Sequence, residues 1–483
     1  MATKQLFRRL AMRQYTSAAS KNKAIFLTEK QLQSLALDQE SELIAKEITV
    51  SSEHHVRSSE EADFGRKRIG CVELPKPLVQ GITELIEGQD KRLIRTDALR
   101  LYDALRSTAR IPKESNEDFD GSRKAKKLRN SSAKALVEPH KLSYGPRESV
   151  AYAAGVLPST FAAITNVMHE ISSRMIDFKP RSMLDFGTGP GTAIWAAKEI
   201  FKLDTCVGVD LSEDMLRVAE HLEESVKSES DAAIEFKRYL GFDPKAPKTD
   251  LVVSAFTLGD IASAALQKST IEQLWEQTGD VLVLIDRGTP IGFSNIARAR
   301  QWILDLEGAN AHVVAPVSSH IEASENMSYS LESQCSHDRP CPLLFSPQAK
   351  PDDIWCHFSQ RVQRPTFLMK TKHSKFNTED SKYSYVVLRR GSRPTAGPTT
   401  TMEEKAYAWP RLIQPALKKN GHVVMDVCSK EGEIQRMVIP KSQGKIPYRD
   451  ARKAMWGDLF PHPSKNKVVT RVSQGVVEKQ QSE

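Results

Sequence analysis

The stretch MLDFGTGPGTAIWAA, Met183 to Ala197, decides the fold of this chain. It starts with an apolar run that contains Asp185 and ends at Phe186, and glycines follow at alternate positions, Gly187, Gly189 and Gly191. Glycine permits a sharp turn and lets backbone N–H groups approach a ligand with no Cβ in the way. The last glycine also allows close packing of helix on strand. The stretch therefore predicts a buried strand, a ligand-binding turn and the beginning of a helix.

Three further apolar segments predict the rest of a parallel sheet. CVGVDLS (Cys206 to Ser212) carries Asp210 at the tip of a second strand, and TDLVVSAF (Thr249 to Phe256) and DVLVLIDRGTPIGF (Asp280 to Phe293) give two more strands. Helical stretches separate them, and this alternation is typical of a doubly wound α/β sheet. In such sheets an acid at the tip of the second strand holds the ribose hydroxyls of a nucleotide-type ligand.

The spacing D-x-G-x-G-x-G differs from the dinucleotide fingerprint G-x-G-x-x-G, because an acid precedes the first glycine. It resembles the class I methyltransferase family, whose fold is Rossmann-like. The resemblance implies that Asp210 binds the ribose hydroxyls of S-adenosylmethionine. It also implies that the turn lines the methionine and ribose side of the cofactor, with Asp185, Gly187, Gly189 and Gly191. An NAD-type Rossmann unit and a vestigial ligand site are the alternatives.

Composition and the start of the chain indicate location and partners. The 483 residues suffice for two or three domains, and the net charge of +8 favours a polyanionic partner. No apolar run is long enough to span a bilayer, so no membrane partner is expected. Residues 1–28 are amphipathic and free of acids, with Lys4, Arg8, Arg9, Arg13, Lys21 and Lys23. They predict a mitochondrial presequence; a chloroplast transit peptide and a disordered basic tail are the alternatives.

Four cysteines fall in the last third of the chain, at Cys335, Cys341, Cys356 and Cys428. Prolines surround the first three, so we expect these on loops, where thiolates can converge on one metal or cluster. The intervals of 5, 14 and 71 residues match neither a zinc finger nor a ferredoxin. Three interpretations remain open from spacing: reduced buried thiols, a zinc site that includes His337 or His357, and a [4Fe-4S] cluster.

Several motifs together resemble the mitochondrial small-subunit ribosome-assembly family of methyltransferase-like proteins. They are LDFGTGPGTA, IDRGTPIGF, C-x5-CP, WCHFSQRVQR and Y-R-x-A-R-K-x-x-W-G-D-L (Tyr448 to Leu459), and the similarity runs from about Tyr144 to Pro461. The resemblance implies a [4Fe-4S] cluster on the four cysteines and association with small-subunit rRNA and ribosomal proteins. This chain departs from the family where the fourth strand ends, since Asp286-Arg287-Gly288 replaces Glu-Pro-Gly.

The expected organisation follows from these segments. It comprises a presequence (1–28), a helical N-terminal region (29–143), a methyltransferase-like domain (144–310 and 375–395), a cysteine-bearing insertion (311–374), a β-hairpin extension (396–462) that carries Cys428, and a basic tail (463–483). The basic run Gly121 to Asn130 is a candidate for contact with RNA phosphates, and so is a second group. That group comprises Lys441, Lys445, Arg449, Arg452, Lys453, Lys465, Lys467 and Arg471, with Tyr448 and Trp456 nearby. Solvated loops are the alternative.

The function expected from these features is assembly of, or association with, the mitochondrial small ribosomal subunit in the matrix. The chain would bind rRNA, and not DNA, through a methyltransferase-like fold and a [4Fe-4S]-stapled extension. An active S-adenosylmethionine-dependent rRNA methyltransferase is the alternative, and an iron–sulfur sensor of cluster supply is a third hypothesis. The sequence has no Asn-Pro-Pro-Tyr motif and no convincing base, so no catalytic residue is assigned.

Overall fold

The computed structural model describes residues 58–107, 142–226, 233–241, 247–316, 355–372, 376–394, 400–430 and 432–472. The chain divides into two units, Met1–Arg57 and Ser58–Glu483, and every described residue belongs to the second. The predicted presequence, the basic run at 121–130, Cys335 and Cys341 lie outside the described residues.

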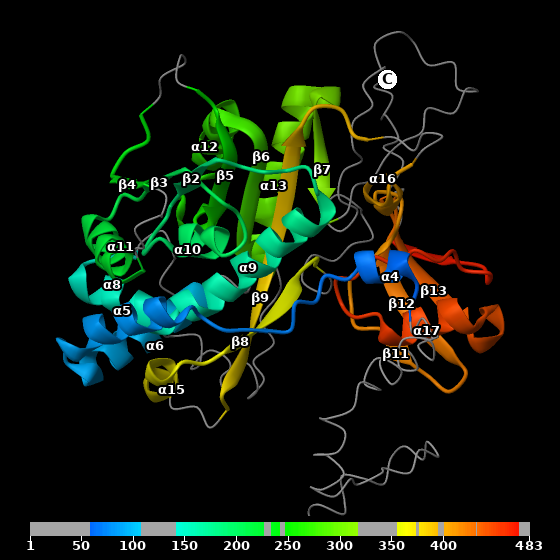
Figure 1. The fold of residues 1–483 in the computed structure, drawn as a ribbon, viewed down its shortest axis with the longest axis horizontal. Coiled ribbons are helices and arrows are strands. Elements are labelled where there is room, and N and C mark those ends of the chain that lie inside the picture. The colour runs from blue at the N-terminus through cyan, green and yellow to red at the C-terminus, as the bar shows by residue number, and fades with distance from the viewer. Residues whose placement is uncertain are drawn as a thin grey trace, which may run out of the picture. The chain divides into compact units, whose positions relative to one another are not determined.

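The described helices pack around two sheets (Figure 1). The helices are α4 (Glu60–Phe64), α5 (Lys76–Glu87), α6 (Lys91–Ser107), α8 (Pro146–Gly155), α9 (Leu157–Arg174), α10 (Thr192–Lys198), α11 (Glu213–Val226), α12 (Ala264–Gln277), α13 (Pro290–Glu307), α15 (Thr366–Lys372), α16 (Met402–Ala406) and α17 (Lys445–Lys453), with single 3-10 turns η2 (Leu258–Asp260), η3 (Gly308–Asn310) and η4 (Lys441–Gln443). The strands of the first sheet are β1 (Cys71–Val72), β2 (Ser182–Phe186), β3 (Thr205–Val209), β4 (Ala233–Lys237), β5 (Thr249–Ala255), β6 (Thr278–Arg287), β7 (Ala311–Ala315), β8 (Phe358–Gln363) and β9 (Thr378–Arg390). Those of the second are β10 (Arg411–Leu412), β11 (Leu417–Lys418), β12 (His422–Cys428), β13 (Ile434–Pro440) and β14 (Val469–Val472).

The nine-stranded sheet has the order β1-β8-β9-β6-β5-β2-β3-β4. Its strands β4, β3, β2, β5 and β6 are parallel, and β9 runs antiparallel to β6. Strands β7 and β8 pair with different halves of β9, and β1 extends β8 in parallel. This sheet confirms the predicted doubly wound fold of the class I methyltransferase kind.

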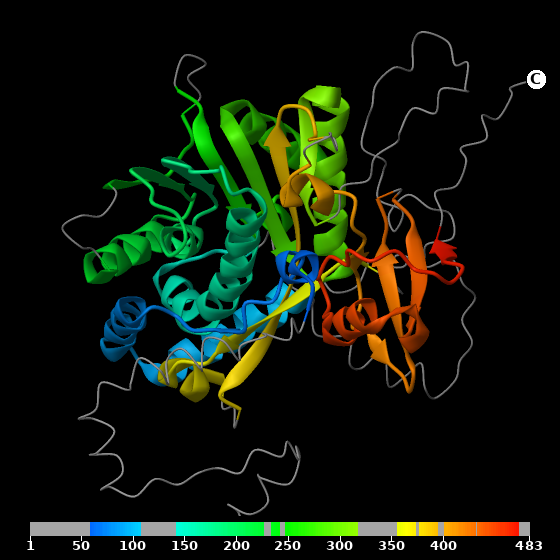
Figure 2. The same ribbon diagram turned by 45° about the vertical axis from the view of Figure 1, so that its right-hand side comes forward.

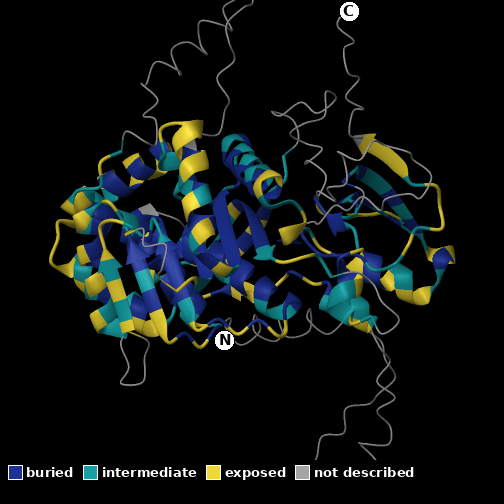
Figure 3. Cartoon of the chain, turned by 90° about the horizontal axis from the view of Figure 1, so that it is seen from above, coloured by how far each residue is buried: buried dark blue, intermediate teal, exposed yellow. Residues whose placement is uncertain are grey.

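Side-chain alternation along the central strands explains why helices cover both faces of this sheet. In β6, Val281, Val283 and Ile285 join the apolar cluster that includes side chains of α9, whereas Leu282 and Leu284 join the cluster of α12 and α13. A strand buried on both faces reads as a continuous apolar run, because successive side chains point to opposite faces. Figure 3 shows the result as fully buried central strands between helices that are exposed on their outer sides.

The predicted strand Asp280–Phe293 is wrong in its second half, because β6 ends at Arg287 and α13 begins at Pro290. Thr289 caps α13, since its Oγ1 accepts a hydrogen bond from the N–H of Gly292 at 3.1 Å. Threonine at the cap followed by proline in the first turn is a helix start signal. The residues from Pro290 to Phe293, expected in a strand, therefore form the first turn of α13.

The second sheet contains the predicted hairpin and has the order β10-β12-β13-β14, with β11 on β12. Strands β12 and β13 pair from His422–Pro440 to Cys428–Ile434, and Gly432 has the positive φ of 72° that a tight turn favours. The face of this sheet that meets α17 (Figure 2) is apolar, with Val423, Met425, Val427, Met437 and Ile439 buried beside Ala451. The sheet thus has a small core of its own.

The segment from Ser58 to Val72 connects the two sheets. The N–H of Lys67 donates to Asp458 Oδ1 at 2.9 Å, and the carbonyl of Gly65 accepts from the N–H of Leu459 at 2.8 Å. The same segment ends in β1, which pairs with β8 of the first sheet. The beginning of the described chain is therefore held by residues near its end.

A buried carboxylate lies where these parts meet. Glu170 of α9 forms ion pairs with Lys67 at 2.6 Å and with Arg411 of β10 at 2.5 Å, and it accepts a hydrogen bond from the hydroxyl of Tyr385 on β9. Burial opposes ionisation, but the charges of Arg411 and Lys67 hold the pKa of Glu170 well below its usual range. One ionised side chain thus joins the N-terminal segment, α9, β9 and the second sheet.

None of the described helices is long and apolar enough to cross a membrane alone; α8 and α9, at 57° to each other, satisfy that criterion only when they are taken as a pair.

We predict that Glu170→Gln lowers the free energy of unfolding by about 3 to 5 kcal/mol, because it leaves buried Lys67 and Arg411 without a counter-charge. Chemical denaturation of the purified chain measures this value. The control is Glu148→Gln, which breaks an ion pair to Arg100, a side chain that is 54% exposed; we expect a loss of at most about 1 kcal/mol. Equal losses in the two variants would contradict the role given to Glu170.

Candidate functional site

The glycine turn after β2 is fixed by the end of β3. The carbonyl of Val209 accepts hydrogen bonds from the N–H groups of Gly187 and Thr188, at 2.8 and 2.9 Å. The turn continues into α10, and the indole of Trp195 donates to the carbonyl of Pro190 at 2.8 Å. The backbone of the turn is therefore held on both sides before any ligand binds.

Each predicted glycine has a positive φ, but the three meet different surroundings. A Cβ at Gly187 would lie 2.2 Å from Oγ1 of Thr257, and one at Gly191 would lie 2.8 Å from the ring of Trp195. A Cβ at Gly189 would meet nothing within 4 Å. Gly187 and Gly191 are therefore required by packing, whereas the backbone of Gly189 faces open space that a ligand can approach.

Asp210 lies at the tip of β3, directly against the turn, as the sequence predicts. Its Oδ2 accepts from the N–H of Gly189 at 2.8 Å, and its Oδ1 accepts from the N–H of Ser212 at 2.9 Å. Burial raises the pKa of Asp210. Each carboxylate oxygen has a second lone pair, so Asp210 can still accept hydrogen bonds from ligand hydroxyls.

Asp185 lies beneath the turn and is 1% exposed. Its Oδ2 accepts a hydrogen bond from Oγ1 of Thr188 at 2.7 Å. Burial raises the pKa of Asp185 to about 7. Asp185 thus supports the turn and, together with Gly187 and Gly189, lines a cavity of only about 20 Å³, which is room for about one water molecule.

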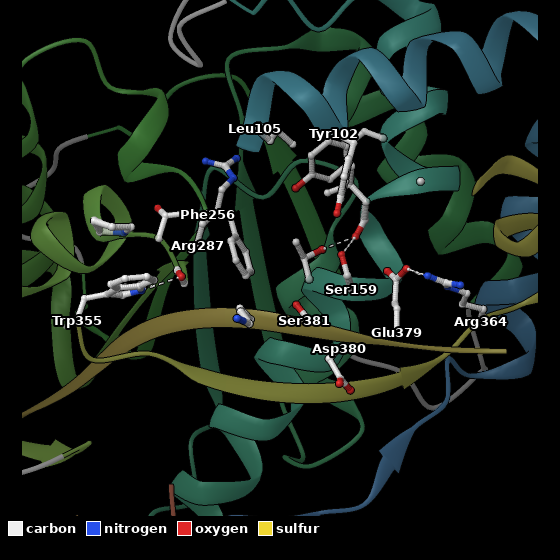
Figure 4. A pocket seen from close by; sticks show the side chains of 18 residues that line it. Tyr102, Leu105, Ser159, Phe256, Arg287, Trp355, Arg364, Glu379, Asp380 and Ser381 are labelled. Carbon is white, nitrogen blue, oxygen red and sulfur yellow. Dashed lines mark hydrogen bonds and ion pairs between the residues drawn. The ribbon is translucent and has the colours of Figure 1, made fainter. Parts of the chain in front are cut away.

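A larger cavity of about 530 Å³ adjoins the small one, and the two share Tyr152, Thr160 and Phe256 as walls. Figure 4 shows Arg287 and Trp355 toward one end of it and the ion pair of Arg364 with Glu379 toward the other. Its walls come from α6, α8, α9, the β6–α13 turn, β9 and the single residues Phe256, Trp355 and Arg364. This cavity was not predicted, because no single sequence motif contains its walls.

Phe256 lines both cavities, and its backbone conformation was not predicted from the sequence. It has a φ of +62°, the only positive value among the described residues that are not glycine, and its N–H donates to the carbonyl of Ile285 at 2.7 Å. Such a conformation costs of the order of 1 to 3 kcal/mol and is typical of functional sites.

At the end of β6, where Asp286-Arg287-Gly288 replaces the Glu-Pro-Gly of the family, the acid and the arginine have different positions. Asp286 is buried and accepts hydrogen bonds from the side chain of Asn295 at 3.0 Å and from the N–H of Arg287 at 2.7 Å. It anchors α13 and does not line the cavity. Arg287 does line it.

Two of the four predicted metal ligands are described. Cys356 precedes β8, Cys428 ends β12, and both are half-buried against one apolar cluster of Phe293, Ala297, Ile413 and Ile434. Within the described ranges no three His, Cys, Asp or Glu side chains gather as a metal site. Cys335 and Cys341 are outside those ranges.

The segment with Cys356 also forms a wall of the large cavity. Trp355 donates from its Nε1 to the carbonyl of Gly288 at 3.0 Å and stacks on His357 at 5.0 Å. Burial lowers the pKa of His357, whose ring also meets the edge of Trp456. The cysteine segment therefore contacts the turn that carries Arg287.

Known proteins resemble this chain over most of its length. The mitochondrial ribosome assembly protein METTL17 of Homo sapiens is 33% identical over 365 residues, which cover 74% of this chain and 73% of that protein. The mitochondrial ribosome assembly protein RSM22 of Saccharomyces cerevisiae is 23% identical over 69% of this chain and 71% of its own length. The mitochondrial Rsm22-cox11 tandem protein 2 of Schizosaccharomyces pombe is 26% identical over 85% of this chain, which spans 54% of that protein.

Solved methyltransferase structures match less closely. Magnesium protoporphyrin IX methyltransferase from Synechocystis has a TM-score of 0.25 and 13% identity, over 44% of this chain and 94% of that one. The strand order described above carries the assignment of the fold.

A family model described as mitochondrial small ribosomal subunit Rsm22 matches residues 146–461, which include most of both sheets. The family resemblance seen in the motifs is thereby confirmed, and the mitochondrial location predicted from the sequence agrees with the names of these relatives. The chain belongs to the mitochondrial small ribosomal subunit Rsm22 family.

Proposed function

We propose that this protein acts in the mitochondrial matrix in assembly of the small ribosomal subunit and binds its rRNA. The observation that carries the proposal is the family match over residues 146–461, together with relatives that are named ribosome assembly proteins. Because the match continues through the second sheet, the proposed role belongs to the whole described fold and not to the methyltransferase-like sheet alone.

The outer face of α17 supports contact with RNA. Its inner side is anchored by buried Asp450 and Ala451, whereas Lys445, Arg449, Arg452 and Lys453 are exposed. The guanidinium of Arg452 lies 5.9 Å from the ring centre of Tyr448. Lysine and arginine neutralise phosphates without reading sequence, and an aromatic ring beside them can stack on a base.

Complementation in cells that lack the protein tests this proposal. We expect deletion to deplete mature mitochondrial small subunits. Arg449→Glu with Arg452→Glu should fail to restore them, because the exposed face of α17 then repels phosphate. Lys202→Glu with Lys268→Glu makes the same charge change on exposed residues of the methyltransferase-like part of the chain, and should restore assembly. Normal small subunits in deleted cells would refute the proposed function.

We propose as a second function an S-adenosylmethionine-dependent rRNA methyltransferase. The open backbone at Gly189 and the position of Asp210 favour it. Asp210 would hold the ribose hydroxyls, and Asp185, Gly187, Gly189 and Gly191 would form the turn around the cofactor, which supplies a sulfonium methyl group when bound. The cavity of about 20 Å³ at the turn is too small for this cofactor, so binding requires the neighbouring side chains to move.

We predict that Asp210→Ala lowers the affinity for S-adenosylhomocysteine about ten- to hundredfold, because hydrogen bonds to a charged acceptor are lost. Titration calorimetry on the purified chain measures this. The control is Asp204→Ala, which removes a carboxylate with 43% exposure on the loop before β3 and should leave the affinity unchanged. An affinity equal to that of the wild type in Asp210→Ala would exclude the proposed ribose contact.

We propose that Cys335, Cys341, Cys356 and Cys428 bind a [4Fe-4S] cluster, with zinc as the alternative. In support, Cys356 and Cys428 are distant in sequence but pack on one apolar cluster. Thiolates in an apolar shell suit iron–sulfur clusters and zinc alike. The cluster would staple the segment that precedes β8 to the last residue of β12 and so add folding free energy.

Anaerobic purification followed by iron, sulfide and zinc analysis tests the cluster. We expect about four irons and four sulfides per chain, and a loss of iron in Cys428→Ser. Cys71→Ser is the matched control, because Cys71 is an exposed thiol on β1 and should be dispensable for iron binding. One zinc without sulfide would favour the zinc site, and unchanged iron in Cys428→Ser would exclude Cys428 as a ligand.

A further inference from the structure

The cavity of about 530 Å³ has a composition that indicates its ligand. Its volume lies in the range typical of small-molecule sites, about 300 to 1,000 Å³. Aromatic rings from three separate segments line it, namely those of Tyr102, Tyr152 and Trp355, with Phe256 at its inner end. Flat aromatic walls favour a flat ligand, such as a nucleobase.

The cations of the cavity differ in whether their hydrogen-bond donors already have a carboxylate partner. Arg364 pairs with Glu379 at 2.9 Å, so its charge is compensated. Arg287 donates from its backbone N–H only, and no described residue accepts a hydrogen bond from its guanidinium. The ammonium of Lys382 forms no ion pair within the described ranges either. Burial lowers the pKa of Arg287, but the carboxylates of Asp260 and Asp286 raise it and keep the guanidinium charged. Arg287 and Lys382 therefore keep hydrogen-bond donors for an anionic ligand.

The position of Arg287 is fixed by close backbone packing. The N–H of Gly288 donates to the carbonyl of Lys382 at 3.0 Å, and a Cβ at Gly288 would lie 2.7 Å from the backbone of Tyr383. The β6–α13 turn is thereby pressed against β9, which brings Arg287 and Lys382 to one cavity. The N-terminus of the 18-residue helix α13 lies there too, with Thr289 and Pro290 in the wall, and its dipole also favours negative charge.

We propose that this cavity binds a single unstacked nucleotide of RNA, with Arg287 and Lys382 on its phosphate and the ring of Trp355 against its base. The hydrogen bond from Trp355 to Gly288 holds the indole beside the turn that carries Arg287, so the contacts for base and phosphate are mutually fixed. The inference rests on the rRNA binding proposed above and gives it a site. It also places the nucleotide beside the glycine turn, because the two cavities share walls.

Calorimetric titration of the full chain with uridine and adenosine 5′-monophosphates tests the proposal. Uridine, adenosine and inorganic phosphate serve as partial ligands. We expect the monophosphates to bind more tightly than the nucleosides or inorganic phosphate. Arg287→Gln should lower the affinity for the monophosphates about tenfold or more, to that of the nucleosides. Trp355→Leu should weaken monophosphates and nucleosides alike. Arg217→Gln, the same change at a side chain of α11 that is 64% exposed, should change neither.

A second variant guards against loss of fold at Arg287. Lys382→Gln alters an exposed side chain at the same cavity and should weaken the monophosphates without changing thermal unfolding. Monophosphate affinities unchanged in both variants, phosphate binding as tightly as the monophosphates, or displacement of the monophosphate by S-adenosylhomocysteine would each overturn the proposal. None of these results requires ribosomes, so failure here is separate from failure of the assembly function, which is read in cells.

Discussion

The ionised carboxylate of Glu170 is the constraint on which the rest of the described structure depends. It is surrounded by groups from the N-terminal segment, β9 and β10, and each of these brings a different part of the chain to α9. An ion in such surroundings is stable only while its counter-charges stay in place. Glu170 therefore specifies the arrangement of the two sheets more than it adds to stability.

The second sheet and the segment with Cys356 depend on this arrangement. Arg411, which closes the ion cluster, is the register partner of Cys428 on β12. Cys356 is tied to β9, because its carbonyl accepts from the hydroxyl of Ser384 at 2.8 Å. The two thiols are thus positioned by backbone contacts with the elements that surround Glu170, and Trp355 extends the same contacts to the large cavity.

The sequence allowed prediction of the features that arise from short stretches. The turn at Gly187 to Gly191 and the acid at Asp210 were predictable because strand, turn and helix signals follow one another within a few residues. Strand β8 was not, although FSQRVQ alternates between buried and exposed side chains, because its neighbour β1 lies almost 300 residues earlier in the sequence. The large cavity was missed for the same reason, since its walls come from segments far apart in the chain. Asp286 shows a further limit, because an acid at an expected position can serve packing alone.

The contacts of the N-terminal segment have a consequence for the order in which the molecule can form. Ser59 bonds to Asp450, and Lys67 to Asp458, each across 391 residues. Contacts between residues so far apart in sequence form late in folding, because closing the intervening loop lowers the chain entropy before the contacts can stabilise the fold. In a polypeptide that is synthesised from its N-terminus, Ser59 and the N–H of Lys67 therefore lack these two partners until almost all of the chain is available. A truncation before Asp450 would remove both carboxylates and so free the N-terminal segment from these contacts.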